Sequence, residues 1–295
     1  MATELATRTR VRKAVVPAAG LGTRLRPLSD FIPKELLPIG RKPVLAYVLE
    51  ELRGAGISDV LFVVSERKPQ IRALFGDGMP VEGELPAVRI DYVTQVEQRG
   101  LGDAILQAEA WADGEPFAVA FGDCLMESEG RMGGGAPLCR IIDTHVERGA
   151  AATACVERVA WERVSRYGVV APEAGRDPAS DLPFRAVDIV EKPKREEAPS
   201  NLVVAARWVL DPEIFNALRR TPIDSRGELQ LTNAVRISTQ SGNPLWAAPL
   251  QPGEARRDIG GFDSFFATFV RAALADPECG EAARRAAQDM LARVE

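Results

Sequence analysis

Residues 18–24 read Ala-Ala-Gly-Leu-Gly-Thr-Arg and directly follow the apolar run 13–16. Small residues let backbone N–H groups approach phosphate oxygens closely, and the side chains of Arg24 and Lys34 can neutralise the phosphate charge. No Gly-Lys-Ser or Gly-Lys-Thr follows, as a P-loop requires, and Leu25 stands where a dinucleotide-binding loop has its third glycine. The pattern therefore predicts a third kind of nucleotide loop, suited to a triphosphate.

Polar residues at the ends of three other strand-like runs could complete such a site. The amide of Gln95 can read the edge of a base, and the adjacent glycines let backbone groups approach the same ring. Asp123 closes an apolar run, where a carboxylate suits Mg2+. Glu191 can accept from two sugar hydroxyls, and Lys192 can hold a phosphate. Plainer roles remain open, namely a solvated loop for Gln95, a turn cap for Asp123 and a surface ion pair for Glu191 with Lys192.

Asp258 is a further carboxylate that precedes a helix expected from Phe262, where an acidic residue can also serve only as a cap. His145, the only histidine, is predicted on the surface in the middle of a polar helix. A histidine so placed supports neither a Ser-His-Asp nor a Cys-His nucleophile. We therefore expect a reaction that needs no histidine base.

The composition is that of an ordinary soluble globular protein, with 295 residues, 46% hydrophobic and 27% charged. The net charge of −5 gives no support to nucleic-acid or anionic-membrane binding, so cations that meet a polyanionic substrate must be concentrated locally. The four cysteines lack zinc-type spacing and are expected to be reduced thiols. With no apolar signal segment and no run of about 18 apolar residues, the sequence predicts a cytoplasmic location.

The elements that must position these residues alternate along the first half. Apolar periodicity predicts strands at 13–16, 59–64, 88–94 and 116–121, and helices at 43–56, 69–75 and 101–111. This alternation predicts a doubly wound parallel sheet, whose ligands lie beyond the carboxyl ends of its strands. The loop 18–24 and the turn at Asp123 both fall there.

The second half changes character after residue 126 and predicts a mixed sheet. It has a Gly-rich loop at 129–136, strands at 152–157, 167–171, 184–191 and 202–209, an exposed hairpin excursion at 172–183, and helices at 138–148, 212–220, 229–239, from 262 onward and at 280–295. We predict a flexible arm (1–12), one domain (13–260) and C-terminal helices (261–295). The domain divides into a nucleotide half (about 13–126) and a sugar half (about 127–260).

In their order, these motifs resemble those of sugar-1-phosphate nucleotidylyltransferases, most of all the bacterial UTP–glucose-1-phosphate uridylyltransferases. The resemblance covers roughly residues 13 to 271 and rests on residues 18–27, 33–38, Gln95, 100–102, 122–123, 166–170, 191–194, 198–202, 227–234 and 258–260. It implies an α/β fold of the nucleotide-diphospho-sugar transferase type, with a Rossmann-like mixed, mainly parallel sheet, helices on both faces and a C-terminal helical appendage.

The resemblance also implies roles for individual residues and partners for the chain. Ala18, Ala19, Gly20, Gly22, Thr23 and Arg24 would hold the nucleotide, with Arg24 and Lys34 on its phosphates; Gln95 and Gly100 would contact the pyrimidine; Asp123 and Asp258 would coordinate Mg2+; Gly168 and Glu191 would contact the sugar; and Lys192 would hold its phosphate. Arg24, Lys34 and Lys192 would be the catalytic cations. The implied substrates are UTP (or dTTP) and glucose 1-phosphate, the cofactor is Mg2+, and a homo-oligomer, either dimer or tetramer, is expected.

This chemistry agrees with the absence of a usable histidine, because the phosphate oxygen of a sugar 1-phosphate is already ionised and acts as its own nucleophile. Thymidylyl transfer from dTTP and a non-catalytic nucleotide-sugar sensor remain alternatives, whereas an incomplete dinucleotide loop gives little support to an oxidoreductase. Two departures concern the sugar half. Asn233 stands where the family usually has Asp, and the Lys usual a few residues after Asp258 is missing.

Overall fold

The computed structural model of the chain describes residues 11–79 and 87–293. The predicted arm, 1–12, lies outside the described residues except at its last two positions. Val11 is buried, and the carbonyl of Arg12 accepts hydrogen bonds from the amides of Ser58 and Asp59 at 3.0 and 3.1 Å. These two residues therefore belong to the domain and not to the arm.

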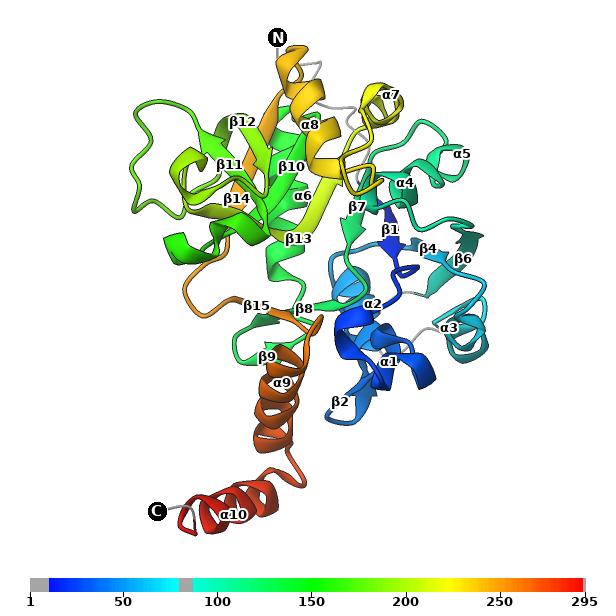
Figure 1. The fold of residues 1–295 in the computed structure, drawn as a ribbon, viewed down its shortest axis with the longest axis vertical. Coiled ribbons are helices and arrows are strands. Elements are labelled where there is room, and N and C mark those ends of the chain that lie inside the picture. The colour runs from blue at the N-terminus through cyan, green and yellow to red at the C-terminus, as the bar shows by residue number, and fades with distance from the viewer. Residues whose placement is uncertain (1–10, 80–86, 294–295) are drawn as a thin grey trace.

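A ten-stranded sheet runs through the described part of the chain (Figure 1). In spatial order its strands are β10 (Ala152–Arg158), β14 (Leu245–Pro249), β12 (Phe184–Glu191), β11 (Gly168–Pro172), β13 (Leu202–Leu210), β7 (Phe117–Ala120), β1 (Lys13–Pro17), β4 (Asp59–Val64), β6 (Val88–Thr94) and β5 (Gly78–Met79).

The sheet is mixed, and its parallel character belongs mainly to the first half. There β7, β1, β4 and β6 pair in parallel, as the βαβαβ alternation predicts. In the second half β10 and β14 pair in parallel. The other pairs there are antiparallel, namely β11 with β12, β12 with β14, β11 with β13, and β10 with β13. Because β10 also pairs with β13, the pairings of these five second-half strands close a ring.

Helices cover both faces of the sheet, and alternate residues of β1 show why. Ala14 and Val16 belong to one apolar core and Val15 to the other, as the two-residue period of a strand requires. The first core includes residues of α2 (Val44–Gly54), α3 (Pro69–Phe75) and α6 (Ala136–Arg148). The second includes residues of α4 (Leu101–Leu106), α5 (Glu109–Ala112), α7 (Glu213–Arg220) and α8 (Leu231–Gln240). The helix expected over 101–111 is thus divided into α4 and α5.

Two small sheets and several short helices connect the main elements, and two C-terminal helices extend beyond the sheet. A three-stranded sheet orders β15 (Ala255–Asp258), β8 (Cys124–Ser128) and β9 (Arg131–Met132), and β2 (Pro38–Ile39) pairs with β3 (Lys42–Pro43). The short helices are η2 (Thr23–Leu25), α1 (Leu28–Phe31), η3 (Lys34–Leu36), η4 (Trp161–Arg166) and η5 (Arg195–Glu197). Helices α9 (Phe262–Ala275) and α10 (Gly280–Leu291) project from the body, with α10 at the far tip (Figure 1).

A fully buried ion pair ties the centre of the sheet to α2. Arg207 of β13 donates from Nε and Nη2 to Glu51 at 2.8 and 2.6 Å, and neither side chain is accessible to solvent. The same Nη2 also donates to the carbonyl of Cys124 at 2.9 Å. Because Cys124 begins β8, this pair also fixes the strand that follows Asp123.

The placement of His145 on the surface is wrong, because its side chain is only 2% exposed. It follows Leu138 and Ile141 at helical spacing on the inner face of α6, which the polar neighbours along the sequence obscure. Its Nδ1 lies 3.1 Å from Thr153 Oγ1, and its Nε2 lies 3.0 Å from Asp211 Oδ1. The imidazole thereby joins α6 to β10 and to Asp211, the residue that directly follows β13.

The four cysteines, all within the described residues, are free thiols. Two of them, Cys124 and Cys155, are buried, and burial raises the pKa of the Cys124 thiol to about 12. Among the described residues, no helix is long and apolar enough to cross a membrane.

Candidate active site

A cavity of about 1420 Å³ opens between the two halves of the sheet and is bordered by the start of α9. Most of the predicted site residues line it: Ala19, Gly20, Arg24, Lys34, Gln95, Gly100, Asp123, Gly168, Glu191, Lys192 and Asp258. Ala18, Gly22 and Thr23 are not part of its lining. The volume exceeds the usual range for one small ligand, so the cavity can hold two substrates at once.

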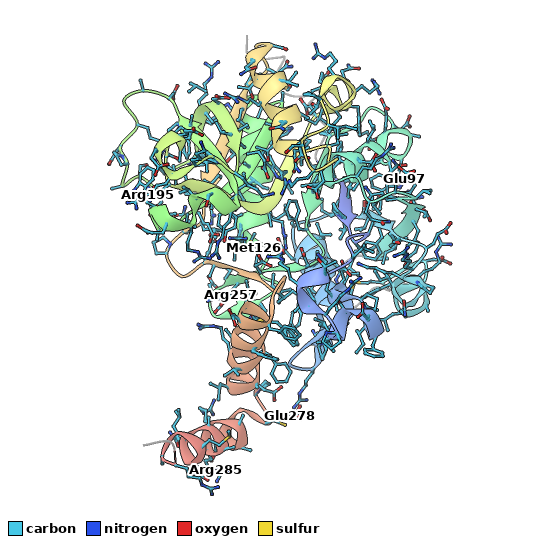
Figure 2. The ribbon with its side chains drawn as sticks, viewed as in Figure 1. Glu97, Met126, Arg195, Arg257, Glu278 and Arg285 are labelled. Atoms are coloured by element: carbon cyan, nitrogen blue, oxygen red, sulfur yellow. The ribbon has the colours of Figure 1, made fainter. Side chains whose placement is uncertain are left out.

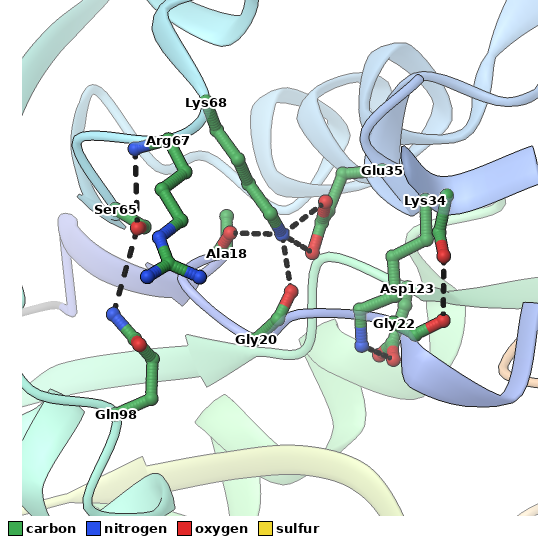
Figure 3. A network of polar contacts seen from close by, with 11 residues as sticks. Ala18, Gly20, Gly22, Lys34, Glu35, Ser65, Arg67, Lys68, Gln98 and Asp123 are labelled. Carbon is green, nitrogen blue, oxygen red and sulfur yellow. Dashed lines mark hydrogen bonds and ion pairs between the residues drawn. The ribbon is translucent and has the colours of Figure 1, made fainter. Parts of the chain in front are cut away.

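The loop after β1 is held by a buried lysine that sequence reasoning missed. The Lys68 ammonium donates to the carbonyl of Ala18 at 2.8 Å, to the carbonyl of Gly20, and to both carboxylate oxygens of Glu35 at 2.9 and 2.8 Å (Figure 3). An ammonium has three donors and no lone pair, so it can bond both carbonyls while the two oxygens of the Glu35 carboxylate share its third N–H. Because the carbonyl oxygens of Ala18 and Gly20 point toward Lys68, they do not face the cavity, where they would repel a bound phosphate.

Burial opposes charge on both members of this pair. It lowers the pKa of Lys68 and raises the pKa of Glu35, and the attraction between the two groups offsets part of each effect. Their side chains are 7% and 1% exposed. One signal in the sequence pointed to Lys68, because it stands just after β4, at the edge of the sheet where the loop 18–22 also lies.

Lys34 and Asp123 form a second pair, beside the first and open to the cavity. The Lys34 ammonium contacts Oδ2 of Asp123, and the two side chains are 16% and 21% exposed (Figure 3). Burial alone would raise the pKa of Asp123, but the Lys34 charge and hydrogen bond outweigh it, so the pKa is lowered. Burial alone would lower the pKa of Lys34, but Asp123, Glu35 and Asp258 raise it. Both groups are therefore charged at neutral pH.

Asp258 lies near Asp123 because β15 pairs with β8. Asp258 lies opposite Cys124, and the amide of Ile259 donates to the carbonyl of Asp123 at 3.2 Å. Asp258 Oδ1 also accepts from the amide of Gly260 at 2.6 Å. This bond closes a local turn and does not cap α9, whose N-cap residue is Gly261 and which has no side-chain cap, so the cap expected from the position of Asp258 is not formed. A Cβ on Gly260 would lie 2.6 Å from Arg24 Nη2, which shows that the guanidinium approaches this turn closely.

The two aspartates fit a divalent cation only in part. The described residues contain no group of three or more His, Cys, Asp or Glu side chains that could hold a metal ion. A hard cation such as Mg2+ is often bound by one or two carboxylates together with substrate phosphates. Asp123 and Asp258 match that pattern, because both line the cavity beside Arg24 and Lys34, the cations expected to face phosphate.

Gln95 is buried at the end of β6, and its amide is already oriented. Its Nε2 donates to Oδ2 of Asp103 at 2.7 Å and to the carbonyl of Gly100 at 3.2 Å. Gly100 adopts φ +93°, and a Cβ there would lie 2.8 Å from the carbonyl of Leu229. Only glycine fits this position, so the turn that borders Gln95 is fixed.

The second half contributes a group of cavity-lining residues around β11 and β12. Gly168 pairs with Glu191 across these strands, and a Cβ on Gly168 would lie 3.0 Å from Thr232 Oγ1 and 3.5 Å from Glu191 Oε2. Lys192 has a left-handed backbone, with φ 45°, and its ammonium lies 2.9 Å from Glu191 Oε1. The ion pair that the plainer interpretation expects is therefore present, but both residues line the cavity.

Two arginines of β15 add positive charge that the sequence analysis did not single out. Arg256 donates to Glu157 at 2.6 Å and lies 4.7 Å from the ring centre of Tyr167. Arg257 donates to Glu127 at 2.6 Å and lies near the first turn of α9 (Figure 2). Of the two family departures, Asn233 is not part of the cavity lining. Residues 261–264, which follow Asp258 and contain no Lys, are part of it.

The cavity thus combines a glycine loop, several cations and two adjacent carboxylates, and His145 is not part of its lining. Such a site can bind two phosphate compounds and place them side by side, with cations available to stabilise charge on the phosphates. The individual roles of these residues remain predictions.

Comparison with known proteins agrees with a site that binds phosphate compounds. The nucleotidyl transferase family pattern matches residues 13–273. The chain is 36% identical to the UTP–glucose-1-phosphate uridylyltransferase of Mycoplasma pneumoniae, over 90% of this chain and 93% of that protein. It superposes with TM-score 0.82 on a UTP-bound UGPase from Acinetobacter baumannii, at 29% identity over 94% of this chain and 99% of the other. A UDP-glucose pyrophosphorylase complexed with UDP-glucose gives TM-score 0.76, at 31% identity over 88% and 97%. The chain therefore belongs to the nucleotidyl transferase family.

Proposed function

We propose that this enzyme transfers a uridylyl group from UTP to glucose 1-phosphate, giving UDP-glucose and diphosphate. The observation that carries the proposal is the single cavity that joins the glycine loop, Lys34 and Asp123 of the first half to Glu191 and Lys192 of the second. The relatives named for this activity, with UTP or UDP-glucose bound in two solved structures, support the choice of substrates. No observation favours dTTP or a purely regulatory role.

The reaction follows from positioning and charge. An ionised phosphate oxygen of glucose 1-phosphate attacks the α-phosphorus of UTP, the bond from that phosphorus to the β-phosphate oxygen breaks, and diphosphate leaves with its electron pair. No proton is transferred, so no general base is required. Arg24 and Lys34 stabilise charge on the triphosphate, while Lys192 and Glu191 hold the sugar phosphate and sugar in line.

Asp123 and Asp258 are the residues that would hold Mg2+ here. When bound, the cation neutralises phosphate charge and polarises the phosphoryl oxygens. The chain's own contribution is to keep Asp123 ionised through the Lys34 contact and to place Asp258 near it through the β8–β15 pairing. We also propose a cytoplasmic location, since the substrates are intracellular metabolites and the cysteines are free thiols.

A diphosphate-release assay tests the function directly. The purified chain is incubated with Mg2+, glucose 1-phosphate or galactose 1-phosphate, and each of UTP, dTTP, CTP, GTP and ATP. We expect release with UTP and glucose 1-phosphate, at a rate well above the other pairs. A preference for dTTP would replace the proposed nucleotide, and no release with any pair would favour a sensor.

Lys192→Ala is expected to raise the KM for glucose 1-phosphate by about tenfold or more, because a charged hydrogen bond to the sugar phosphate is lost. The KM for UTP should change much less, since Lys192 lies on the opposite half of the cavity from the nucleotide loop. Initial rates at varied concentrations of each substrate measure the two constants. Lys194→Ala, an exposed neighbour outside the cavity lining, is the matched control. A larger effect on UTP than on the sugar phosphate would reject the assignment.

We propose that a second copy of the chain covers the outer face of α9, giving the expected homo-oligomer. Phe266 and Val270, one helical turn apart, are 56% and 51% exposed on a helix that projects from the body (Figure 1). The double variant F266E/V270E should run as a monomer near 32.0 kDa in size exclusion with light scattering. Leu74→Glu, at an equally exposed apolar residue of α3, should leave the assembly unchanged. A wild type that is already monomeric would contradict the proposal.

A further inference from the structure

The amide of Gln95 has two neighbours that can only accept hydrogen bonds. One is the carboxylate of Asp103, 2.7 Å from Nε2, and the other is the carbonyl of Gly100, at 3.2 Å. If the amide were turned over, its oxygen would face both of these oxygens, which is unfavourable. The nitrogen must therefore point toward Asp103, and the oxygen Oε1 must point the other way.

That oxygen is available to a ligand. No described residue donates a hydrogen bond to it, although Gln95 is only 4% exposed and lines the cavity. Oε1 is also not among the fully buried polar atoms that lack a hydrogen-bond partner in the described part of the chain. The small exposed surface of Gln95 therefore includes an acceptor that faces the cavity.

Asp103 is itself well held. Its side chain is 8% exposed, it belongs to the first turns of α4, and its Oδ1 lies 3.5 Å from Arg99 Nη2. One carboxylate oxygen thus faces a cation and the other faces the Gln95 amide. A carboxylate here, unlike an amide or a hydroxyl, offers no donor with which the Gln95 oxygen could pair.

We propose that Asp103 is a positioning residue that sets nucleobase selectivity through Gln95. By holding Nε2, it presents Oε1 as a fixed acceptor, which matches a base whose edge carries a ring N–H, as the imide of uracil does. Cytosine presents an unprotonated ring nitrogen at the equivalent position, and two facing acceptors repel. This inference rests on the proposed function, in which Gln95 lies at the base site.

The test compares Asp103→Asn, Asp103→Glu and wild type with UTP and CTP. Asparagine both donates and accepts, so the Gln95 amide can turn over and offer Nε2 to cytosine. We expect Asp103→Asn to raise the KM for UTP by about tenfold and to reduce the UTP-over-CTP ratio of kcat/KM at least as much. The kcat at saturating UTP and the KM for glucose 1-phosphate should change little. Asp103→Glu keeps a carboxylate and should retain most of the selectivity.

A control and a binding measurement separate the possible outcomes. Asp91→Asn removes a carboxylate that accepts from Trp111 Nε1 at 2.8 Å outside the cavity, and its selectivity should equal that of wild type. Calorimetric titration with UTP and CTP measures the same preference without turnover. If wild type prefers UTP in binding but releases no diphosphate, the proposed function fails and this inference survives. If Asp103→Asn lowers only the melting temperature and keeps the UTP-over-CTP ratio, the inference is wrong.

Discussion

Asp123→Asn is expected to lower kcat by about 1,000-fold or more while the protein remains folded. The substitution removes a charge that the cavity keeps ionised, because the Lys34 ammonium holds the pKa of Asp123 below its usual range. An amide has similar size, so the change leaves the packing of β8 and the β8–β15 pairing intact. Raising the Mg2+ concentration should recover only a small part of the loss, since Asp258 alone remains to bind the cation.

The measurement is kcat for diphosphate release as a function of Mg2+ concentration, together with the melting temperature. Asp188→Asn is the matched control, because Asp188 is ion-paired with Arg236 at 2.8 Å and is not part of the cavity lining. We expect near-normal activity from that variant. Near-normal turnover by Asp123→Asn at ordinary Mg2+ would remove its metal role.

Residues that follow buried strands could be placed from the sequence because parallel strands end at one edge of the sheet. The predicted bounds of β4, α3, β6 and β12 agree with the structure residue for residue. The three strands have apolar or alternating patterns, and α3 begins at a proline, which favours the first position of a helix. The loop after β1, Gln95 and Asp123 were therefore expected together, and one cavity is lined by Gln95, Asp123 and part of the loop.

Other features depend on contacts between distant segments, which no local pattern encodes. The strand β15 contains two adjacent arginines, Arg256 and Arg257, which do not suggest a strand in the sequence. Arg257 pairs with Glu127 of the neighbouring strand β8, and Arg256 pairs with Glu157 of β10 in the large sheet. Only the pairing of β15 with β8 places Asp258 beside Asp123. The buried pair of Arg207 and Glu51 likewise joins residues far apart in the chain.

Lys68 follows β4, but only the fold brings it to the distant Glu35 carboxylate, and its replacement gives the second large effect. Lys68→Met is expected to lower the free energy of unfolding by about 3–5 kcal/mol, because it leaves the Glu35 carboxylate buried without its cation. It also releases the carbonyls of Ala18 and Gly20, so the KM for UTP should rise. Chemical denaturation and initial rates measure the two effects. Lys13→Met is the matched control, since Lys13 also donates to two carbonyls, while its partner Glu115 is 49% exposed.

The pH dependence and a double variant separate the two roles of Lys68. Burial already raises the pKa of Glu35, and without Lys68 it must rise further. The folded state then binds a proton that the unfolded state has released, so the stability of Lys68→Met should increase as the pH falls from about 7 to about 5. The double variant K68M/E35Q carries no buried charge at the pair and should regain stability and lose this pH dependence. It still lacks the donor for the loop carbonyls, so its KM for UTP should stay raised. If the double variant restored the KM as well, the loop would owe its shape to Glu35 being neutralised and not to the hydrogen bonds from Lys68.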